Sequence, residues 1–256
     1  CNFLYSSFYI KGLIDKFGKK GVCFSSKPFI NLRYGVHTHV FVFVANNKKY
    51  VIDFADSNQI FYENFLAWSD VYAKVNYNKN YLPTSYVNKV VKCGCNYGMV
   101  IYKKKIFAAI FALKNYLLSK NRIDFSFRTF LSRYIISTKK QMPIPTINQI
   151  NNNNYIFFVS SYWEGQENCN KSRANFIRAC HNLEKKGIIR FEGGLVCDSN
   201  LQINGYDDVL LNKRFTYTEY ITKLQQSLCV FNTPAYSDCH GWKLAEYIAM
   251  EKVIVS

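Results

Sequence analysis

The stretch that decides the fold is LCVFNTPAYSDCHGWKLAEYIAMEKVIV, residues 228–255. Its pattern predicts an apolar strand at Leu228–Phe231, a polar turn, a helix from Gly241 to Met250, and a second apolar strand at Val253–Val255. Short apolar strands that alternate with helices are typical of a parallel sheet with helices on its faces. The end of the chain therefore predicts an α/β fold.

The same alternation continues upstream as far as residue 155. We expect a strand at 155–159, a polar loop at 160–170, and a helix at 171–186 that ends at Gly187. A strand at 188–191 follows, and Gly193 and Gly194 stop it. A second helix begins with a Thr216/Glu219 capping box and ends near Gln226. We expect residues 155–256 to form one α/β domain.

The first half of the chain has similar but less regular signals. We expect strands at 36–44, 49–54 and 71–75, a helix from Asp56, which Gln59 helps to cap, to about Leu66, and a helix at 103–120. Two prolines and a run of four asparagines then indicate a linker. We therefore predict a basic N-terminal α/β domain on the acceptor side (1–145), an Asn-rich linker (146–154), a C-terminal domain (155–256), and a cleft between the domains.

Positive charge is concentrated in the first half. Residues 1–150 carry 22 lysines and arginines against 6 acidic residues, whereas residues 151–256 carry 11 of each. Such a patch attracts polyanions: nucleic acid, acidic phospholipid, or a substrate that bears a diphosphate. The chain has no uncharged apolar run of about 18 residues, as a membrane-spanning helix would need. It also does not begin with the basic segment and following apolar segment of a signal peptide. We expect a cytoplasmic protein in peripheral contact with an anionic membrane and, because the chain begins without Met, a fragment of a longer one.

Nine cysteines, an odd number at no repeating interval, favour reduced thiols in a cytosolic compartment. Cys93 and Cys95, with His37 and His39, form the closest grouping of metal-ligand residue types. Because one intervening residue is not the usual spacing of zinc ligands, we interpret these residues as structural and expect no metal.

The start of the helix predicted at Gly241 combines groups that suit a diphosphate. A helix start exposes unpaired N–H groups and a partial positive charge, and a glycine there lets an anion approach closely. Lys243 adds a cation, and Glu246, one turn further on, can accept hydrogen bonds from two ribose hydroxyls. Asp238, on the preceding loop, can face another part of the same ligand. The alternative is an ordinary helix with Asp238 as N-cap and Lys243 and Glu246 as a solvated pair.

These residues resemble a known family. Asp238–Ser256 is similar to the donor-binding segment of GT-B glycosyltransferases, in which two acidic residues eight positions apart flank the start of a helix that leads into a short buried strand. The similarity is greatest to bacterial surface-polysaccharide glycosyltransferases, and it extends to residues 155–159, Asn170–Arg173 and Phe191–Gly194. The resemblance implies two Rossmann-like α/β domains of the GT-B type, the second truncated at its C-terminus.

The resemblance also implies a role for each of the donor-binding residues. Glu246 would bind the ribose of a nucleotide-sugar donor, and Lys243 with the N–H groups around Gly241 would bind its diphosphate. Asp238 would bind the transferred sugar, and His240 would lie near the sugar–phosphate junction. Arg173, at the start of the other helix, would supply a second phosphate contact.

Two departures from the family pattern concern the same segment. Asp238 stands where Glu is commonest, and Glu251 stands where a Gly usually closes the helix.

No Asp-x-Asp sequence occurs in the chain, so we expect a metal-independent enzyme with no cofactor besides the donor substrate. As the catalytic base we select Asp56, after the second strand, in preference to Asp53. Its role in helix capping is the rival explanation.

The sequence thus predicts a hexosyltransferase-like glycosyltransferase that moves a sugar from a nucleotide-sugar donor to a hydroxyl of a glycan or a lipid-linked acceptor, in surface polysaccharide synthesis. Two alternatives stay open. One is a basic module that binds nucleic acid or another polyanion, although no recognition motif for nucleic acid occurs and we expect no nucleic-acid partner. The other is a nucleotide-sugar epimerase of the same fold, which would act on the donor alone.

Overall fold

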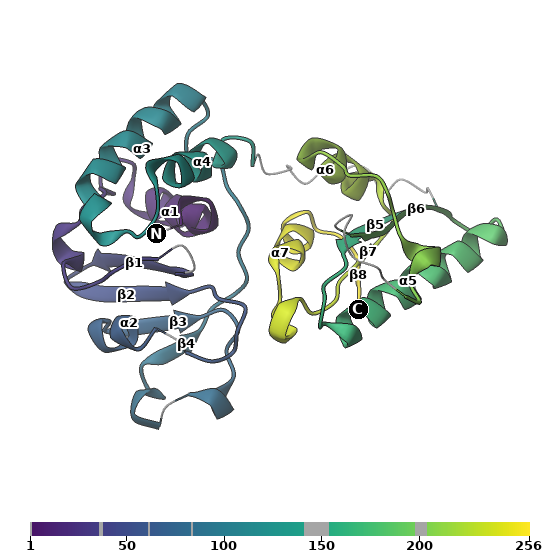
Figure 1. Cartoon of the computed structure of the whole chain (residues 1–256), viewed down its shortest axis with the longest axis horizontal. Coiled ribbons are helices and arrows are strands. Elements are labelled where there is room, and N and C mark those ends of the chain that lie inside the picture. The colour runs from purple at the N-terminus through teal and green to yellow at the C-terminus, as the bar shows by residue number, and fades with distance from the viewer. Residues whose placement is uncertain (1, 36–37, 61, 83, 141–153, 198–203) are drawn as a thin grey trace. The chain divides into compact units, whose positions relative to one another are not determined.

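The computed structural model describes residues 2–35, 38–60, 62–82, 84–140, 154–197 and 204–256 (Figure 1). It is a mixed α/β protein that divides into two compact units. The first unit comprises Cys1–Met142 with Ser237–Trp242, and the second comprises Pro143–Tyr236 with Lys243–Ser256. Each unit has its own buried apolar core. The predicted linker, except Asn154, lies outside the described residues.

The first unit is built on a four-stranded mixed sheet in the order β1-β2-β3-β4. Strand β3 pairs in parallel with β2 and with β4, whereas β1 and β2 are antiparallel. Helices α1, α3 and α4 lie together beside β1 (Figure 1), and Phe3 stacks on Tyr134 with 3.7 Å between their ring centroids. The elements are α1 (Phe3–Phe17), β1 (Val40–Ala45), β2 (Lys48–Asp53), α2 (Glu63–Trp68), β3 (Val71–Lys74), β4 (Val90–Lys92), α3 (Lys105–Ser119) and α4 (Phe127–Ser137).

The antiparallel pair β1–β2 differs from the parallel sheet that a Rossmann-like first domain implies. Only Asn46 and Asn47 separate the two strands, with φ angles of 49° and 60°. A two-residue turn with positive φ closes a hairpin, whereas a parallel connection needs a crossover of a dozen or more residues. Helices α1 and α4 and strand β4 were not predicted.

The helix that we predicted to start at Asp56 is also corrected. Helix α2 begins only at Glu63, and Tyr62 before it makes no capping hydrogen bond through its side chain. Gln59 N donates to Ser57 Oγ (3.1 Å), so the residues after Asp56 form a local turn. The predicted Asp56/Gln59 cap therefore has no helix to cap.

The second unit contains two pairs of parallel strands, β5 with β6 and β7 with β8. Leu228 N donates to Tyr155 O (2.7 Å), which ties the segment before β7 to the start of β5. The elements are β5 (Tyr155–Ser161), α5 (Glu167–Lys185), β6 (Arg190–Val196), α6 (Tyr217–Gln226), β7 (Val230–Phe231), α7 (Trp242–Ala249) and β8 (Ile254–Val255). The predicted order and type of these elements are confirmed, and so is the Thr216/Glu219 capping box.

Two predicted boundaries in the second unit are wrong. The loop expected at 160–170 is shorter, because α5 already begins at Glu167. Strand β6 does not stop at Gly193 and Gly194 but runs through both. A Cβ on Gly193 would lie 1.9 Å from Phe158 O of β5, and one on Gly194 would lie 2.8 Å from Leu211 Cβ. Glycine is therefore needed here for close approach and not for a turn.

A buried ion pair lies inside the sheet of the first unit. Asp53 of β2 and Lys74 of β3 are register partners, with 3.1 Å between Lys74 Nζ and Asp53 Oδ2, and both side chains are fully buried. Tyr72 OH donates to Asp53 Oδ2 (2.7 Å), and Ala55 N donates to Oδ1 (2.9 Å). Both carboxylate oxygens are thus engaged within the core, which removes Asp53 as a candidate base.

We expect Asp53→Ala to destabilise the first unit by about 3–5 kcal/mol, because it leaves the Lys74 ammonium buried without its counter-charge. Urea unfolding monitored by tyrosine and tryptophan fluorescence would show a lower midpoint. The double variant Asp53→Ala/Lys74→Met should recover part of this loss. If Asp53→Ala unfolds at the same urea concentration as the wild type, the ion pair does not stabilise the first unit.

Candidate functional site

Three of the predicted donor-binding residues come together in the second unit, at the carboxyl end of β5. Lys243 Nζ donates to the carbonyl oxygen of Val159, and Arg173 Nη1 donates to that of Ser161 (2.7 Å). Glu246 lies one helical turn beyond Lys243 and interacts electrostatically with its ammonium group. The cluster therefore brings two cations and one carboxylate to the same strand end.

Arg173 is held rigidly on three sides. Its Nε donates to Thr233 Oγ1 (3.1 Å), and its guanidinium carbon lies 4.6 Å from the ring centroid of Trp163. Trp163 is itself anchored by Asn170, whose Oδ1 accepts from Trp163 N (3.0 Å) and whose Nδ2 donates to Trp163 O (2.6 Å). Arg173 lies within α5, in its second turn, so its predicted place at a helix start is corrected.

The electrostatics of the cluster centre on Lys243. Burial and, next, the positive charge of Arg173 lower the pKa of the Lys243 ammonium to about 7, and Glu246 opposes this shift. Glu246 is 5% exposed, and its Oε1 lies 3.4 Å from Tyr217 OH, which donates to it. Burial also lowers the pKa of Arg173, but a guanidinium stays charged near neutral pH.

This arrangement can hold an anion. An ammonium group has three donors, of which the Val159 carbonyl takes one, and a guanidinium has five, of which Thr233 and Ser161 take two. Oxygens of a diphosphate accept from both kinds of group, and charge-assisted bonds of this type are strong. The buried Glu246 accepts hydrogen bonds, as ribose hydroxyls require.

The other predicted residues belong to the first unit. Ser237–Trp242 is grouped with it, so Asp238, His240 and Gly241 belong to a different unit from Arg173, Lys243 and Glu246. Asp238 and His240 are exposed, and Asp238 has a φ of 56°. Asp56, also of the first unit, is an exposed residue. Partial burial of its carboxyl group raises the pKa of that group, and the electrostatic interaction with His39 opposes this rise.

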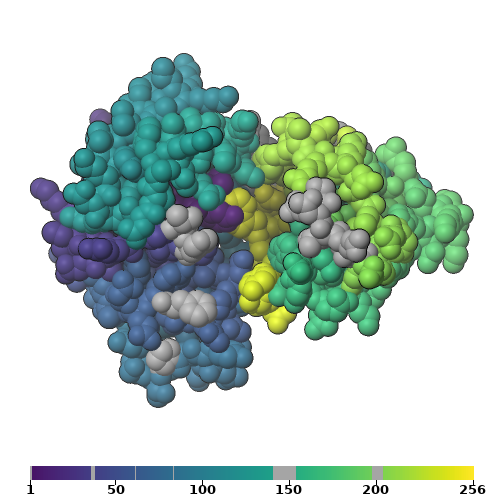
Figure 2. Space-filling view, viewed as in Figure 1, coloured from purple at the N-terminus to yellow at the C-terminus, as the bar shows by residue number. Residues whose placement is uncertain are grey.

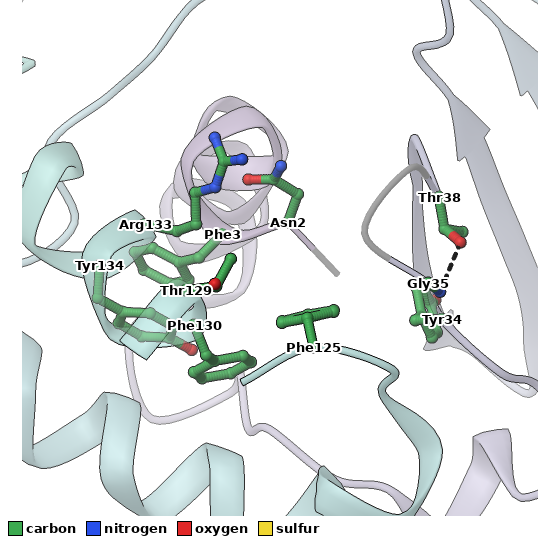
Figure 3. Close-up of a pocket in the computed structure, with 10 residues that line it drawn as sticks. All are labelled: Asn2, Phe3, Tyr34, Gly35, Thr38, Phe125, Thr129, Phe130, Arg133 and Tyr134. Atoms are coloured by element: carbon green, nitrogen blue, oxygen red, sulfur yellow. Dashed lines mark hydrogen bonds between the residues drawn. The ribbon is translucent and has the colours of Figure 1, made fainter. Parts of the chain in front are cut away.

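A small cavity in the first unit lies between α1, α4 and the segment around Tyr34 (Figure 3). Its volume is about 20 Å³, room for a single water molecule. Figure 3 shows the rings of Phe3, Phe130 and Tyr134 close together, with Gly35 N donating to Thr38 Oγ1 (2.8 Å) at the other side. It is a packing void and not a substrate site.

A much larger cavity, of about 810 Å³, lies in the same unit and was not predicted. Phe3, Phe41, Tyr102 and Phe111 are among its many apolar and aromatic lining residues. The charged side chains among its described lining residues are all basic: Lys11, Lys19, Lys103 and Arg122. A cavity of this size and lining suits a drug-sized apolar ligand, and its charges suit an anionic one.

Among the described residues, no three His, Cys, Asp or Glu side chains come together as a metal site. The described cysteines, Cys93 and Cys95 included, form no disulfide with one another, and His37 lies outside the described residues. Comparisons with protein-family models, with curated proteins and with solved structures found no match to this chain.

We expect the stability of the second unit to depend on pH through Lys243. Its pKa of about 7 lies below the value of 10.5 for an exposed lysine, so between these values the unfolded chain binds a proton that the folded chain does not. This contribution to the unfolding free energy therefore rises as pH increases above about 7. Below that pH, both states are protonated and the contribution is constant.

The measurement is urea unfolding from pH 7 to pH 9 for the wild-type protein and for Lys243→Met. The wild-type protein should gain stability relative to Lys243→Met as the pH rises, since the thiols that also ionise in this range are common to both. A difference in unfolding free energy that stays constant with pH would mean that the ammonium group remains charged in the folded state.

Proposed function

We propose that this protein is a glycosyltransferase of the GT-B type, which transfers a sugar from a nucleotide-sugar donor to a hydroxyl group. The observation that carries the proposal is the convergence of Arg173, Lys243 and Glu246 at the carboxyl end of β5. Ligands of α/β sheets bind at the carboxyl ends of the strands. The two cations match a diphosphate, and the carboxylate beside them matches the hydroxyls of the attached ribose.

In this mechanism, the acceptor oxygen forms a bond to the anomeric carbon, the bond between that carbon and a diphosphate oxygen breaks, and negative charge develops on the departing nucleoside diphosphate. Lys243 and Arg173 stabilise that charge, as a divalent cation does in metal-dependent transferases. Because the two cations are hydrogen-bonded to backbone carbonyls of β5, their side chains are already positioned before the donor arrives. Little free energy is therefore needed to reorient these two side chains when the charge develops.

The proposal retains the roles that the family resemblance implies for the residues of the first unit. Asp238 binds the transferred sugar, the N–H groups around Gly241 bind the diphosphate, and His240 lies near the sugar–phosphate junction. Asp56, selected for its place after the second strand and not from the resemblance, removes the proton of the acceptor hydroxyl. The raised pKa of its carboxyl group supports this role, because a general base is most effective when its pKa lies near the working pH.

We further propose that the acceptor is linked to a lipid and is not a free glycan. The 810 Å³ cavity of the first unit supports this choice, because its apolar lining suits a hydrocarbon chain and its basic side chains suit a phosphate. An enzyme with such an acceptor would work at the cytoplasmic face of a membrane, in surface polysaccharide synthesis.

A thermal-shift screen with UDP, GDP and CDP tests the donor site. We expect one of them to raise the midpoint of the second unit, with a gain of about 2.7 kcal/mol at a concentration one hundred times its Kd. Glu246→Gln should weaken binding about tenfold, or about 1.4 kcal/mol, because an amide replaces one acceptor oxygen with a donor. Glu251→Gln, an exposed acid beyond the end of the same helix, is the matched control and should behave as the wild type.

Two results of this screen would contradict the proposal. One is that no nucleoside diphosphate stabilises the protein, and the other is that Glu246→Gln and Glu251→Gln respond alike. Two further results would favour the alternatives. Turnover of a nucleotide sugar without acceptor would favour an epimerase, and tight binding of nucleic acid that weakens steeply with salt would favour a polyanion-binding module.

A further inference from the structure

Helix α3 of the first unit has most of its large apolar side chains on the outside. Ile106, Ile110 and Leu117 are 65%, 55% and 58% exposed, and Phe107, Leu113 and Leu118 are exposed as well. The residues that it buries fully are small or polar (Ala108, Ala112 and Asn115), and only Phe111 and Tyr116 among its larger apolar residues pack against the core, half-buried. A surface helix normally has the opposite arrangement, with the apolar stripe facing the core. The outer face of α3 therefore exposes apolar surface of the kind that an apolar partner covers.

The exposed apolar residues form one continuous stripe. Ile106, Ile110, Leu113 and Leu117 follow the spacing i, i+4, i+7 and i+11, which places them on one line along the helix. Phe107 and Leu118 widen this line on one side. Figures 1 and 2 show α3, in blue-green, at the outer surface of the first unit. Contiguous apolar surface of this kind marks a binding face for a protein or a membrane.

The charged residues that α3 and its two ends carry are all of one sign. Lys103, Lys104 and Lys105 are exposed at its start, Lys114 is exposed beside it, and Lys120 is exposed at its end. Residues 103–120 contain no acidic residue. Six apolar side chains framed by five lysines are complementary to an anionic lipid bilayer, whose acyl region takes the apolar groups and whose head groups take the ammonium groups.

A second copy of the chain is a poorer occupant of this face. Two copies that met through the stripe would bring five lysines against five others, and like charges held close in an interface repel. A helix that crosses the membrane is not the explanation either. No helix among the described residues is both long and apolar enough to span a bilayer.

We propose that the outer face of α3 is a peripheral membrane-binding surface that docks on anionic bilayers. The helix lies along the interface with Ile106, Ile110 and Leu117 inserted below the head groups, while Lys103–Lys105 bind lipid phosphates. This inference stands on α3 alone. It does not depend on the proposed sugar transfer, and the two are tested by different measurements.

Vesicle co-sedimentation with the full chain tests the surface. Wild-type protein should bind vesicles of phosphatidylcholine mixed with phosphatidylglycerol, bind pure phosphatidylcholine weakly, and dissociate with added salt. Ile110→Glu/Leu117→Glu should weaken binding about tenfold or more, because charged side chains do not enter the acyl region. Neutralising Lys103, Lys104 and Lys105 to Gln should remove most of the preference for phosphatidylglycerol.

Ile106→Glu and Ile30→Glu form a matched pair of variants. Both isoleucines belong to the first unit and are 65% exposed, so neither substitution disturbs a core. We expect Ile106→Glu to weaken vesicle binding and Ile30→Glu to leave it unchanged. Unfolding midpoints equal to that of the wild type would show that the variants are folded.

Several results would overturn the proposal. One is wild-type protein that stays in the supernatant with phosphatidylglycerol vesicles. Another is an equal loss of binding in Ile106→Glu and Ile30→Glu. A third is a wild-type dimer in size-exclusion chromatography that Ile110→Glu/Leu117→Glu converts to a monomer, since the stripe would then be an interface between copies of the chain.

Discussion

The burial of two positive charges at one strand end is the constraint on which the second unit depends. Like charges repel, and the repulsion is stronger where water is excluded. Arg173 and Lys243 are held there because carbonyl oxygens of β5 accept from both, and because Glu246 lies beside them. The same bonds tie α5 and α7 to β5. The charged cluster thus orders this end of the unit, and its excess positive charge favours an anionic ligand.

The fold of the second half was more predictable than that of the first for physical reasons. Strand β5 is buried on both faces and so appears as a continuous apolar run, and Thr216 with Glu219 is a local capping signal. In the first unit, α1 begins without a side-chain cap, and its apolar residues surround most of the helix. The Asn46–Asn47 turn and the Ser126 cap of α4, which accepts from Thr129 N (3.3 Å), were local signals that sequence reasoning missed.

The candidate site was predictable only where one helix carries it. Lys243 and Glu246 are one turn apart, so their proximity follows from the helical period, whereas the contact of Arg173 with the same strand end follows from tertiary packing. The large cavity left no sequence signal, because its lining comes from segments as distant as Phe3 and Tyr134. The lysines at 103–105 are adjacent in the sequence, but which way the apolar side chains of α3 point depends on what the helix packs against.

The lowered pKa of Lys243 couples occupancy of the cluster to solvent hydrogen ions. Near neutrality, the amine is only partly protonated in the empty protein, and an anion placed against it favours the ammonium form. Association with any such anion therefore draws protons from the surrounding buffer. The heat of association measured by calorimetry then varies with the ionisation enthalpy of the chosen buffer, and this dependence measures the protons taken up.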